Sequence, residues 1–282
     1  MLAKFKGHLL SVLLLFIPLI CFSQSDTIIT NVERIPCIVR EVTADAIKFS
    51  YPQEELVNTI YKNAIKKVIF KSGRVQLFAE SIPLKTIKSI DDYDLVEITN
   101  LESDTKGLYR VGYVSAKAKG TTTLSNQERV KNRAYRKLKI LAAMMGANIV
   151  FISSQRNEGN KFGGYYQSGS SSETNLTGLA YTNSKLDIKE FRQLIANKPI
   201  YVGVEQTKLW SGDYEVRNEQ ILTKFTIDEI IDDDGIIEIK GEIVNSPGQR
   251  IFKLVSMNKD FFNVFYEDKS TAFNVKIEFN LK

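Results

Sequence analysis

The chain has 282 residues, 43% of them hydrophobic, which is enough for about two or three small domains. It carries 38 Lys and Arg residues against 33 Asp and Glu residues, a formal net charge of +5 that falls to +3 without Lys4 and Lys6 at the N-terminus. This near balance argues against a dedicated binder of polyanions such as nucleic acids. Two cysteines and a single histidine are too few for a zinc site built from the usual ligands.

The first 23 residues have the layout of a secretory signal peptide. Lys4, Lys6 and His8 form a short positive region, an apolar stretch covers 9–22, and Ser23 offers a small residue at the expected cleavage point. The apolar stretch has 14 residues, whereas a membrane-spanning helix needs about 20. We therefore expect export to the periplasm or the extracellular space, with no transmembrane span after cleavage.

Two alternatives for this segment stay open. One is a retained N-terminal anchor. The other is lipidation of Cys21, although Ile20 stands where a lipid-modified cysteine usually has a small residue before it.

Cleavage removes His8, which has consequences for chemistry. The remaining chain has 36 basic and 33 acidic residues, and Cys37 is its one cysteine, so an intramolecular disulfide is excluded. Ser-His-Asp and Cys-His catalysis and histidine-ligated haem are excluded as well. Carboxylate-only and Ser/Lys chemistry remain open, and we expect no cofactor.

The segment 26–80 has the pattern of a small β module. Alternating apolar and polar residues and a glycine turn at Gly73 predict short strands. The expected strands cover 35–42, 46–51, 59–61, 68–70 and 75–78. So many short strands in about 50 residues suit a small barrel.

Three stretches of this segment resemble a small SH3-like β module that is common in secreted proteins of Gram-negative envelopes. They are Asp26-Thr27-Ile28-Ile29-Thr30, Ile38-x-x-Glu41-Val42 and Val68-Ile69-Phe70-x-x-Gly73. The resemblance covers about a fifth of the chain, and it implies a fold but no activity.

The segment 93–183 has the pattern of an α+β domain with one long helix on a sheet. The helix is expected over 125–145, with Ser125 and Glu128 as a capping box and Gly146 as the residue that ends it. The expected strands cover 95–98, 109–114, 149–152 and 174–181.

The run from Leu141 to Val150 joins an alanine-rich helix end, Gly146-Ala147-Asn148 and an apolar strand. It resembles the helix-to-strand corner of envelope stress-sensor lipoproteins and YbjQ-like proteins. The match covers about 25 residues and implies a fold. The cysteines of the stress sensors are absent here, so neither their disulfides nor their sensing role follows.

A helical linker is expected over 184–198, and 199–282 has the pattern of an antiparallel β domain. Its expected strands cover 200–204, 222–231, 236–245, 251–256 and 273–281. The predicted fold class is therefore α+β and mostly β, with a small SH3-like barrel, the central domain and the C-terminal domain.

The long helix carries many basic residues against one acid, Glu128. We take Arg129, Arg133, Arg136 and Lys137 as a candidate interaction face for anionic lipid, lipopolysaccharide or an acidic partner. The alternative is an ordinary solvated helix face.

The polar loop over 157–172 contains three aromatic residues. Phe162, Tyr165 and Tyr166 are candidate contacts to a ligand or a partner. The alternative is a long disordered hairpin loop. No Gly-Lys-Ser/Thr follows Gly163-Gly164, so a phosphate-binding loop is excluded.

Three further features have simpler interpretations. The acidic residues around Asp232-Asp233-Asp234-Gly235 lack calcium-loop spacing and indicate a hairpin turn. Cys37 is expected to be a small buried residue. Trp210, with Tyr201 and Tyr214, is a candidate for sugar stacking, with core packing as the default.

Two functions follow as hypotheses. The first is a non-enzymatic envelope protein that binds an envelope protein or an anionic lipid or glycan surface through its middle domain. The second is a hydrolase of envelope glycan or peptide with carboxylate or Ser/Lys catalysis, which predicts a deep cleft with two converging carboxylates.

Overall fold

We describe the protein from a computed structural model. The description covers most of the chain after the expected signal peptide: 25–30, 33–78, 84–165, 168–196, 201–233, 235–244 and 246–279. Within these residues no helix is both long and apolar enough to cross a membrane. The fold is β-rich, and its strands pair antiparallel except for β7 and β9, so the expected mostly-β α+β class is confirmed.

The N-terminal unit is a six-stranded sheet with the order β4-β3-β2-β1-β5-β6 and antiparallel neighbours. Its elements are β1 (Asp26–Thr30), β2 (Arg34–Val42), β3 (Ala46–Ser50), β4 (Asn58–Tyr61), η1 (Lys62–Ala64), β5 (Ile65–Ile69) and β6 (Val75–Leu77). Ile28, Ile47 and Val68 are fully buried at its centre, because alternate residues of each strand point to one side.

The middle unit is a four-stranded sheet with the order β7-β9-β10-β8, covered by one long helix. Its elements are η2 (Ile90–Leu95), β7 (Glu97–Thr99), η3 (Glu102–Thr105), β8 (Tyr109–Lys119), α2 (Gln127–Met144), β9 (Ile149–Glu158) and β10 (Glu173–Thr182). The apolar face of α2 packs on the sheet through Val130, Ala134 and Leu138, which recur at helical spacing. Gly146 has φ +77° and ends the helix as expected.

The C-terminal unit is a closed barrel in which each strand pairs with the next and β16 pairs with β11. The strands are β11 (Tyr201–Trp210), β12 (Arg217–Asp233), β13 (Ile236–Ile243), β14 (Ser246–Met257), β15 (Phe261–Asp268) and β16 (Thr271–Glu278). The short helix α3 (Ile188–Ile195) packs against it, and Phe191 of α3 belongs to the barrel core.

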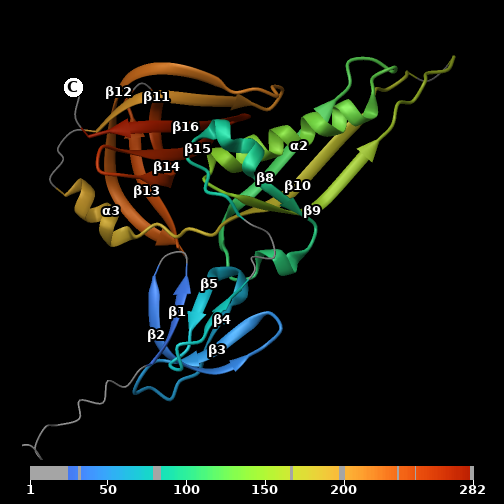
Figure 1. Cartoon of the computed structure of the whole chain (residues 1–282). Coiled ribbons are helices and arrows are strands. Elements are labelled where there is room, and N and C mark those ends of the chain that lie inside the picture. Colours follow the sequence, from blue (N-terminus) through green and yellow to red (C-terminus); the bar gives the residue numbers. More distant parts are fainter. Residues whose placement is uncertain are drawn as a thin grey trace, which may run out of the picture.

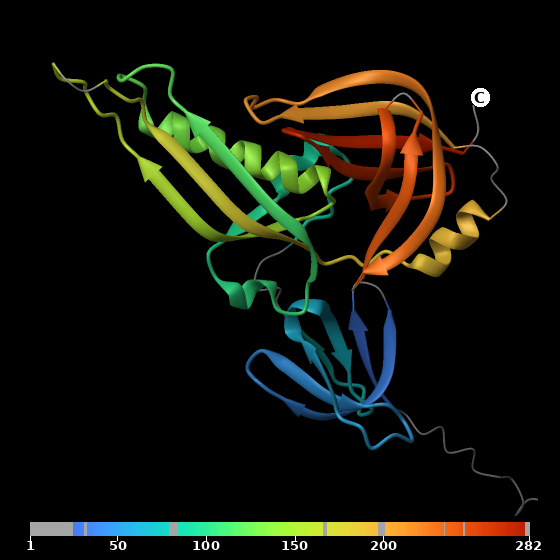
Figure 2. The ribbon, with the colours of Figure 1, turned by 180° about the vertical axis from the view of Figure 1, so that it is seen from behind.

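The three units meet around the segment that follows β10, with the N-terminal sheet below the other two (Figure 1). Viewed from behind, the loop between β11 and β12 reaches toward α2 (Figure 2). The far ends of β8, β9 and β10 project away from the barrel.

Some expected elements differ from the structure. The N-cap of α2 is Asn126, whose Oδ1 accepts from the Arg129 N–H at 2.9 Å, so the expected Ser125 capping box is wrong. Ser125 instead accepts from the Thr122 N–H through its hydroxyl at 3.0 Å. The strand β15 was not expected, because its apolar residues do not alternate cleanly and several consecutive ones are buried.

Gly241 is placed where two barrel strands come unusually close. A Cβ atom there would lie 2.0 Å from the carbonyl oxygen of Thr226, at an irregularity in the β12–β13 pairing. We expect Gly241→Ala to lower the free energy of unfolding by about 2 kcal/mol or more, measured by urea denaturation. The matched control is Gly212→Ala, where a Cβ meets no atom within 4 Å and a change within about 0.5 kcal/mol is expected. Equal stability of the two variants would contradict the close approach.

Candidate functional site

The basic residues of α2 do not lie on one open face. Lys137 is buried, and its Nζ donates to the carbonyl oxygens of Trp210, at 3.0 Å, and Ser211. Burial lowers the pKa of the Lys137 amine, and the nearby Asp213 carboxylate offsets part of that effect. Lys137 therefore fixes the β11–β12 loop to the helix and lies away from the exposed surface.

Two of the predicted arginines hold the same loop. The Arg133 guanidinium lies 4.7 Å from the ring centroid of Tyr214, and its Nη2 donates to the Lys119 carbonyl at 3.2 Å. Arg136 pairs with Glu215 at 3.5 Å. Both arginines thus contact the β11–β12 loop, and Arg129, one turn nearer the N-terminus, is exposed.

The other predicted contacts lie at the far end of the middle unit. Phe162 is 73% exposed and Tyr165 is 95% exposed. Leu124, which the sequence analysis did not single out, is 81% exposed in the loop before α2. We call these three residues, the loop 120–126 and the described parts of the following loop, 159–165 and 168–171, the distal tip. Tyr166, the third predicted contact, lies outside the described residues.

Hydrogen bonds join the two loops of the distal tip. Ser171 Oγ donates to the Gly120 carbonyl at 2.6 Å, and Asn160 Nδ2 donates to the Ser125 carbonyl at 2.8 Å. The backbones of Lys161 and Ser170 exchange hydrogen bonds of 2.8 Å. These contacts give the described part of the loop a defined conformation that presents Phe162 and Tyr165 outward.

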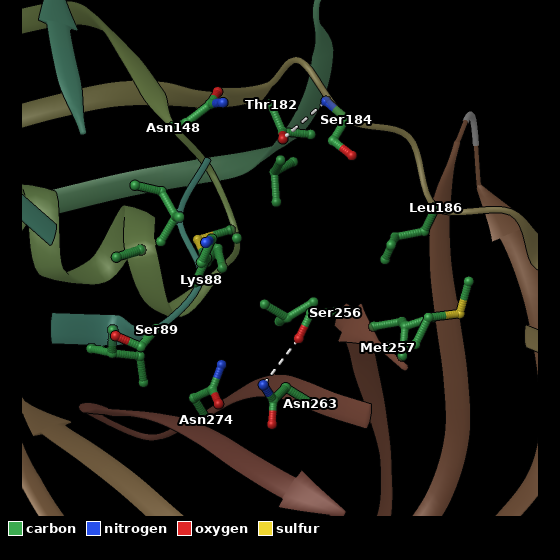
Figure 3. Close-up of a pocket in the computed structure, with 18 of the residues that line it drawn as sticks. Lys88, Ser89, Asn148, Thr182, Ser184, Leu186, Ser256, Met257, Asn263 and Asn274 are labelled. Atoms are coloured by element: carbon green, nitrogen blue, oxygen red, sulfur yellow. Dashed lines mark hydrogen bonds between the residues drawn. The ribbon is translucent and has the colours of Figure 1, made fainter. Parts of the chain in front are cut away.

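A cavity of about 440 Å³ lies where the middle unit meets the outer wall of the barrel (Figure 3). It is lined by the segment around Lys88 and Ser89, the C-terminal end of α2, the chain after β10, and barrel strands that include β11, β14, β15 and β16. Its volume falls within the roughly 300–1,000 Å³ of sites for small ligands. A second cavity, of about 540 Å³, lies between the N-terminal sheet and the segment before α3.

Polar side chains of the barrel form one wall of the 440 Å³ cavity. Asn263, Lys276 and Glu205 are neighbours across β15, β16 and β11, and Asn274 and Thr207 are neighbours in the adjacent row. Asn274 and Lys276 are two residues apart on β16, so both side chains project from the outer face of the barrel.

Two amides on this wall keep an acceptor available. Asn263 Nδ2 donates to Ser256 Oγ at 3.0 Å, and Asn274 Nδ2 donates to the Met144 carbonyl at 2.7 Å. Neither Oδ1 atom accepts a hydrogen bond from the residues that the structure describes. Glu205 also forms no ion pair within that part of the chain.

Asn148 contributes a third amide from the opposite side of the cavity. Its side chain is 3% exposed, and its Nδ2 donates to Asn183 Oδ1 at 2.7 Å. Its Oδ1 is buried and has no hydrogen-bond partner among the described residues. A buried acceptor without a partner costs about 1–3 kcal/mol, so this site is incompletely satisfied.

The remaining predicted residues take structural roles. Cys37 is buried as expected, and burial raises the pKa of its thiol to about 11, which keeps it protonated at neutral pH. Gly235 forms the expected turn between β12 and β13, with φ +88°. Asp234 lies outside the described residues, and no group of three or more His, Cys, Asp or Glu side chains suited to a metal ion occurs among the described ones.

The structure does not bring the predicted sugar-stacking aromatics together. Trp210 is 51% exposed, so the default of core packing is wrong for it. Tyr201 lies at the other end of β11 and packs against Phe262 in the barrel core. Tyr214 lies under Arg133.

Comparison of the chain with protein-family models, with curated proteins and with solved structures gives no match. The function is therefore inferred from the distal tip and from the 440 Å³ cavity between the middle unit and the barrel.

Proposed function

We propose that the protein is an exported, non-enzymatic binding protein of the cell envelope, and that its distal tip binds an anionic lipid surface. The single observation that carries this proposal is the exposure of Leu124, Phe162 and Tyr165, at 81%, 73% and 95%, on one hydrogen-bonded tip. Exposing large apolar side chains to water is unfavourable. Three of them at one projecting end therefore indicate a surface that a binding partner covers.

The surroundings of the tip favour an anionic partner. The stretches 115–133 and 153–175 carry seven Lys and Arg residues and three Glu residues. Two of those acids, Glu158 and Glu173, are already paired with Arg156 and Lys117. Aromatic side chains surrounded by basic residues suit the boundary of an anionic membrane, where rings insert and cations meet headgroups.

The signal-peptide pattern supports a periplasmic or extracellular location. We also propose that the segment 26–80 is an SH3-like module that serves as scaffold, because its short strands pair as an antiparallel sheet.

Hydrolysis is the rival function, and the carboxylates that line the cavity are its candidates. They are Asp91, which is exposed, and Glu205 on β11. A Ser/Lys mechanism finds no support, because no serine hydroxyl is hydrogen-bonded to a lysine amine among the described residues. We favour binding because the cavity wall is formed mainly of amides and hydroxyls.

Sedimentation with lipid vesicles tests the proposed tip. The wild-type protein is expected to bind vesicles of phosphatidylglycerol and phosphatidylethanolamine and to be released by high salt. The double variant Phe162→Ser/Tyr165→Ser should bind at least about tenfold more weakly, since each buried aromatic contributes about 1.5–3 kcal/mol.

Leu222→Ser is the matched control for Leu124→Ser. Leu222 is 70% exposed on β12, close to the 81% of Leu124, but it lies on the barrel. Only the Leu124 variant should weaken vesicle binding. The proposal is overturned if the wild-type protein does not bind anionic vesicles, or if the substitutions of Leu124, Phe162 and Tyr165 leave vesicle binding unchanged. Tip-dependent cross-linking of one envelope protein in intact cells, without vesicle binding, would assign the tip to a protein partner instead.

A further inference from the structure

We infer that the 440 Å³ cavity between the middle unit and the barrel is a binding site for an uncharged ligand rich in hydroxyl and amide groups, of the size and chemistry of an N-acetylated disaccharide. This goes beyond the proposed function, because the distal tip shares none of the residues that line the cavity.

The cavity offers hydrogen-bonding groups on opposite sides. The free Oδ1 atoms of Asn263 and Asn274 belong to the barrel wall, and Asn148, Thr182 and Ser184 line the cavity from the middle unit and the chain that follows it. In Figure 3, Asn148 and Thr182 lie on one side of the cavity, and Asn263 and Asn274 lie on the other. A ligand between them would satisfy acceptors that the protein leaves unpaired.

The type of polar group selects the ligand. Amides and hydroxyls dominate the polar lining, and they donate and accept at neutral charge, as sugar hydroxyls and acetamido groups do. Of the cations that line the cavity, Lys276 is paired with Glu278 at 3.2 Å, and Lys88 and Arg110 are balanced by the carboxylates of Asp91 and Glu205 in the same lining. Glu205, which has no ion pair among the described residues, suits a hydroxyl donor.

The apolar part of the lining fits the same class. Leu186, Met257 and Phe261 lie among the polar residues and offer contact to ring carbons and to an acetyl methyl group. The charged residues of the lining have both signs, with Lys88 and Arg110 against Asp91 and Glu205, so a strongly charged ligand would meet like as well as opposite charges.

Isothermal titration calorimetry of the purified protein with N,N′-diacetylchitobiose tests the inference. Maltose, which has hydroxyls but no acetamido groups, and trialanine, which has amides but no sugar ring, serve as competing probes. We expect diacetylchitobiose to bind and to bind more tightly than maltose, with no heat from trialanine.

The variant Asn263→Ala should weaken diacetylchitobiose binding about tenfold, the effect of one lost hydrogen bond. The matched control is Asn175→Ala, an amide on β10 that bonds to Glu173 at 2.8 Å and does not line the cavity. A thermal unfolding scan of both variants confirms that each is folded. Glu205→Gln should also weaken binding.

Several results would overturn the inference: no binding of either sugar, binding that Asn263→Ala and Glu205→Gln leave unchanged, or preferential binding of trialanine. Equal affinity for maltose would overturn the acetamido part. Chromatography of the incubated sugar distinguishes binding from cleavage, since released monosaccharide that disappears in Glu205→Gln would favour the hydrolase. The Phe162→Ser/Tyr165→Ser variant should keep full sugar affinity, so failure of the tip proposal is distinguishable from failure of this one.

Discussion

Replacing Phe191 with alanine is expected to lower the free energy of unfolding of the barrel by about 3–5 kcal/mol. Phe191 lies on α3 and is fully buried. Its ring meets that of Phe262 edge-on, with 5.3 Å between the centroids and 75° between the planes. Truncation removes this contact and leaves a cavity in the aromatic core of the barrel. Urea unfolding followed by circular dichroism measures the loss.

Phe162→Ala is the control with the same chemical change. Phe162 is 73% exposed on the distal tip, so its truncation should change stability by no more than about 0.5 kcal/mol. If both variants unfold alike, α3 serves as a linker that contributes little to the barrel. If Phe191→Ala unfolds early, α3 is an integral part of the barrel core.

The helices were the part of the fold that the sequence showed best. Val130, Ala134 and Leu138 recur at a period that matches the helix, and all three are buried in α2. The start of α2 shifted by one residue because both Ser125 and Asn126 can cap a helix, and only the backbone path decides between them.

Closure of the barrel was not visible in the sequence. It depends on the pairing of β11 with β16, whose register partners include Trp210 and Thr271. A hairpin turn in the sequence predicts that the strands on either side of it pair, but no local pattern predicts a pairing between the first and last strands of a unit. The same limit explains why β15, with its consecutive buried residues, was missed.

The candidate sites also differ in whether a local sequence pattern predicts them. Phe162 and Tyr165 stood out because aromatic residues are unusual in a polar loop, and the structure places both on the surface. The cavity had no such signal, because its amides come from positions as distant as Asn148 and Asn274. Lys137 was misplaced because its partners, the carbonyls of Trp210 and Ser211, are more than 70 residues away.

Replacing Lys137 with methionine is expected to lower the free energy of unfolding by about 2–3 kcal/mol. Methionine keeps the stem of the side chain as far as Cε but removes the ammonium group, which leaves the Ser211 carbonyl oxygen without its donor and the Trp210 carbonyl oxygen with the Asp213 N–H alone. Trp210 is the single tryptophan of the chain, so its fluorescence reports directly on this loop. We expect the emission of Trp210 to shift to longer wavelength as the loop separates from α2.

The pH dependence of this variant gives a second, independent result. The pKa of Lys137 is lower in the folded protein than its ordinary value of 10.5, so the unfolded chain binds the proton more tightly. The stability of the wild-type protein therefore rises with pH between the folded pKa and 10.5, and the Lys137→Met protein lacks this increment. Other titrating groups, such as Cys37, are common to both proteins and cancel in the difference.

Lys131→Met separates the role of the buried amine from that of helix charge. Lys131 lies on the same helix, with its Nζ 6.0 Å from the ring centroid of Tyr135, and its replacement should leave stability, Trp210 emission and pH dependence nearly unchanged. If Lys137→Met behaves like Lys131→Met, the β11–β12 loop is held by Arg133 and Arg136 alone. If it behaves as expected, one buried lysine couples the middle unit to the barrel through the β11–β12 loop.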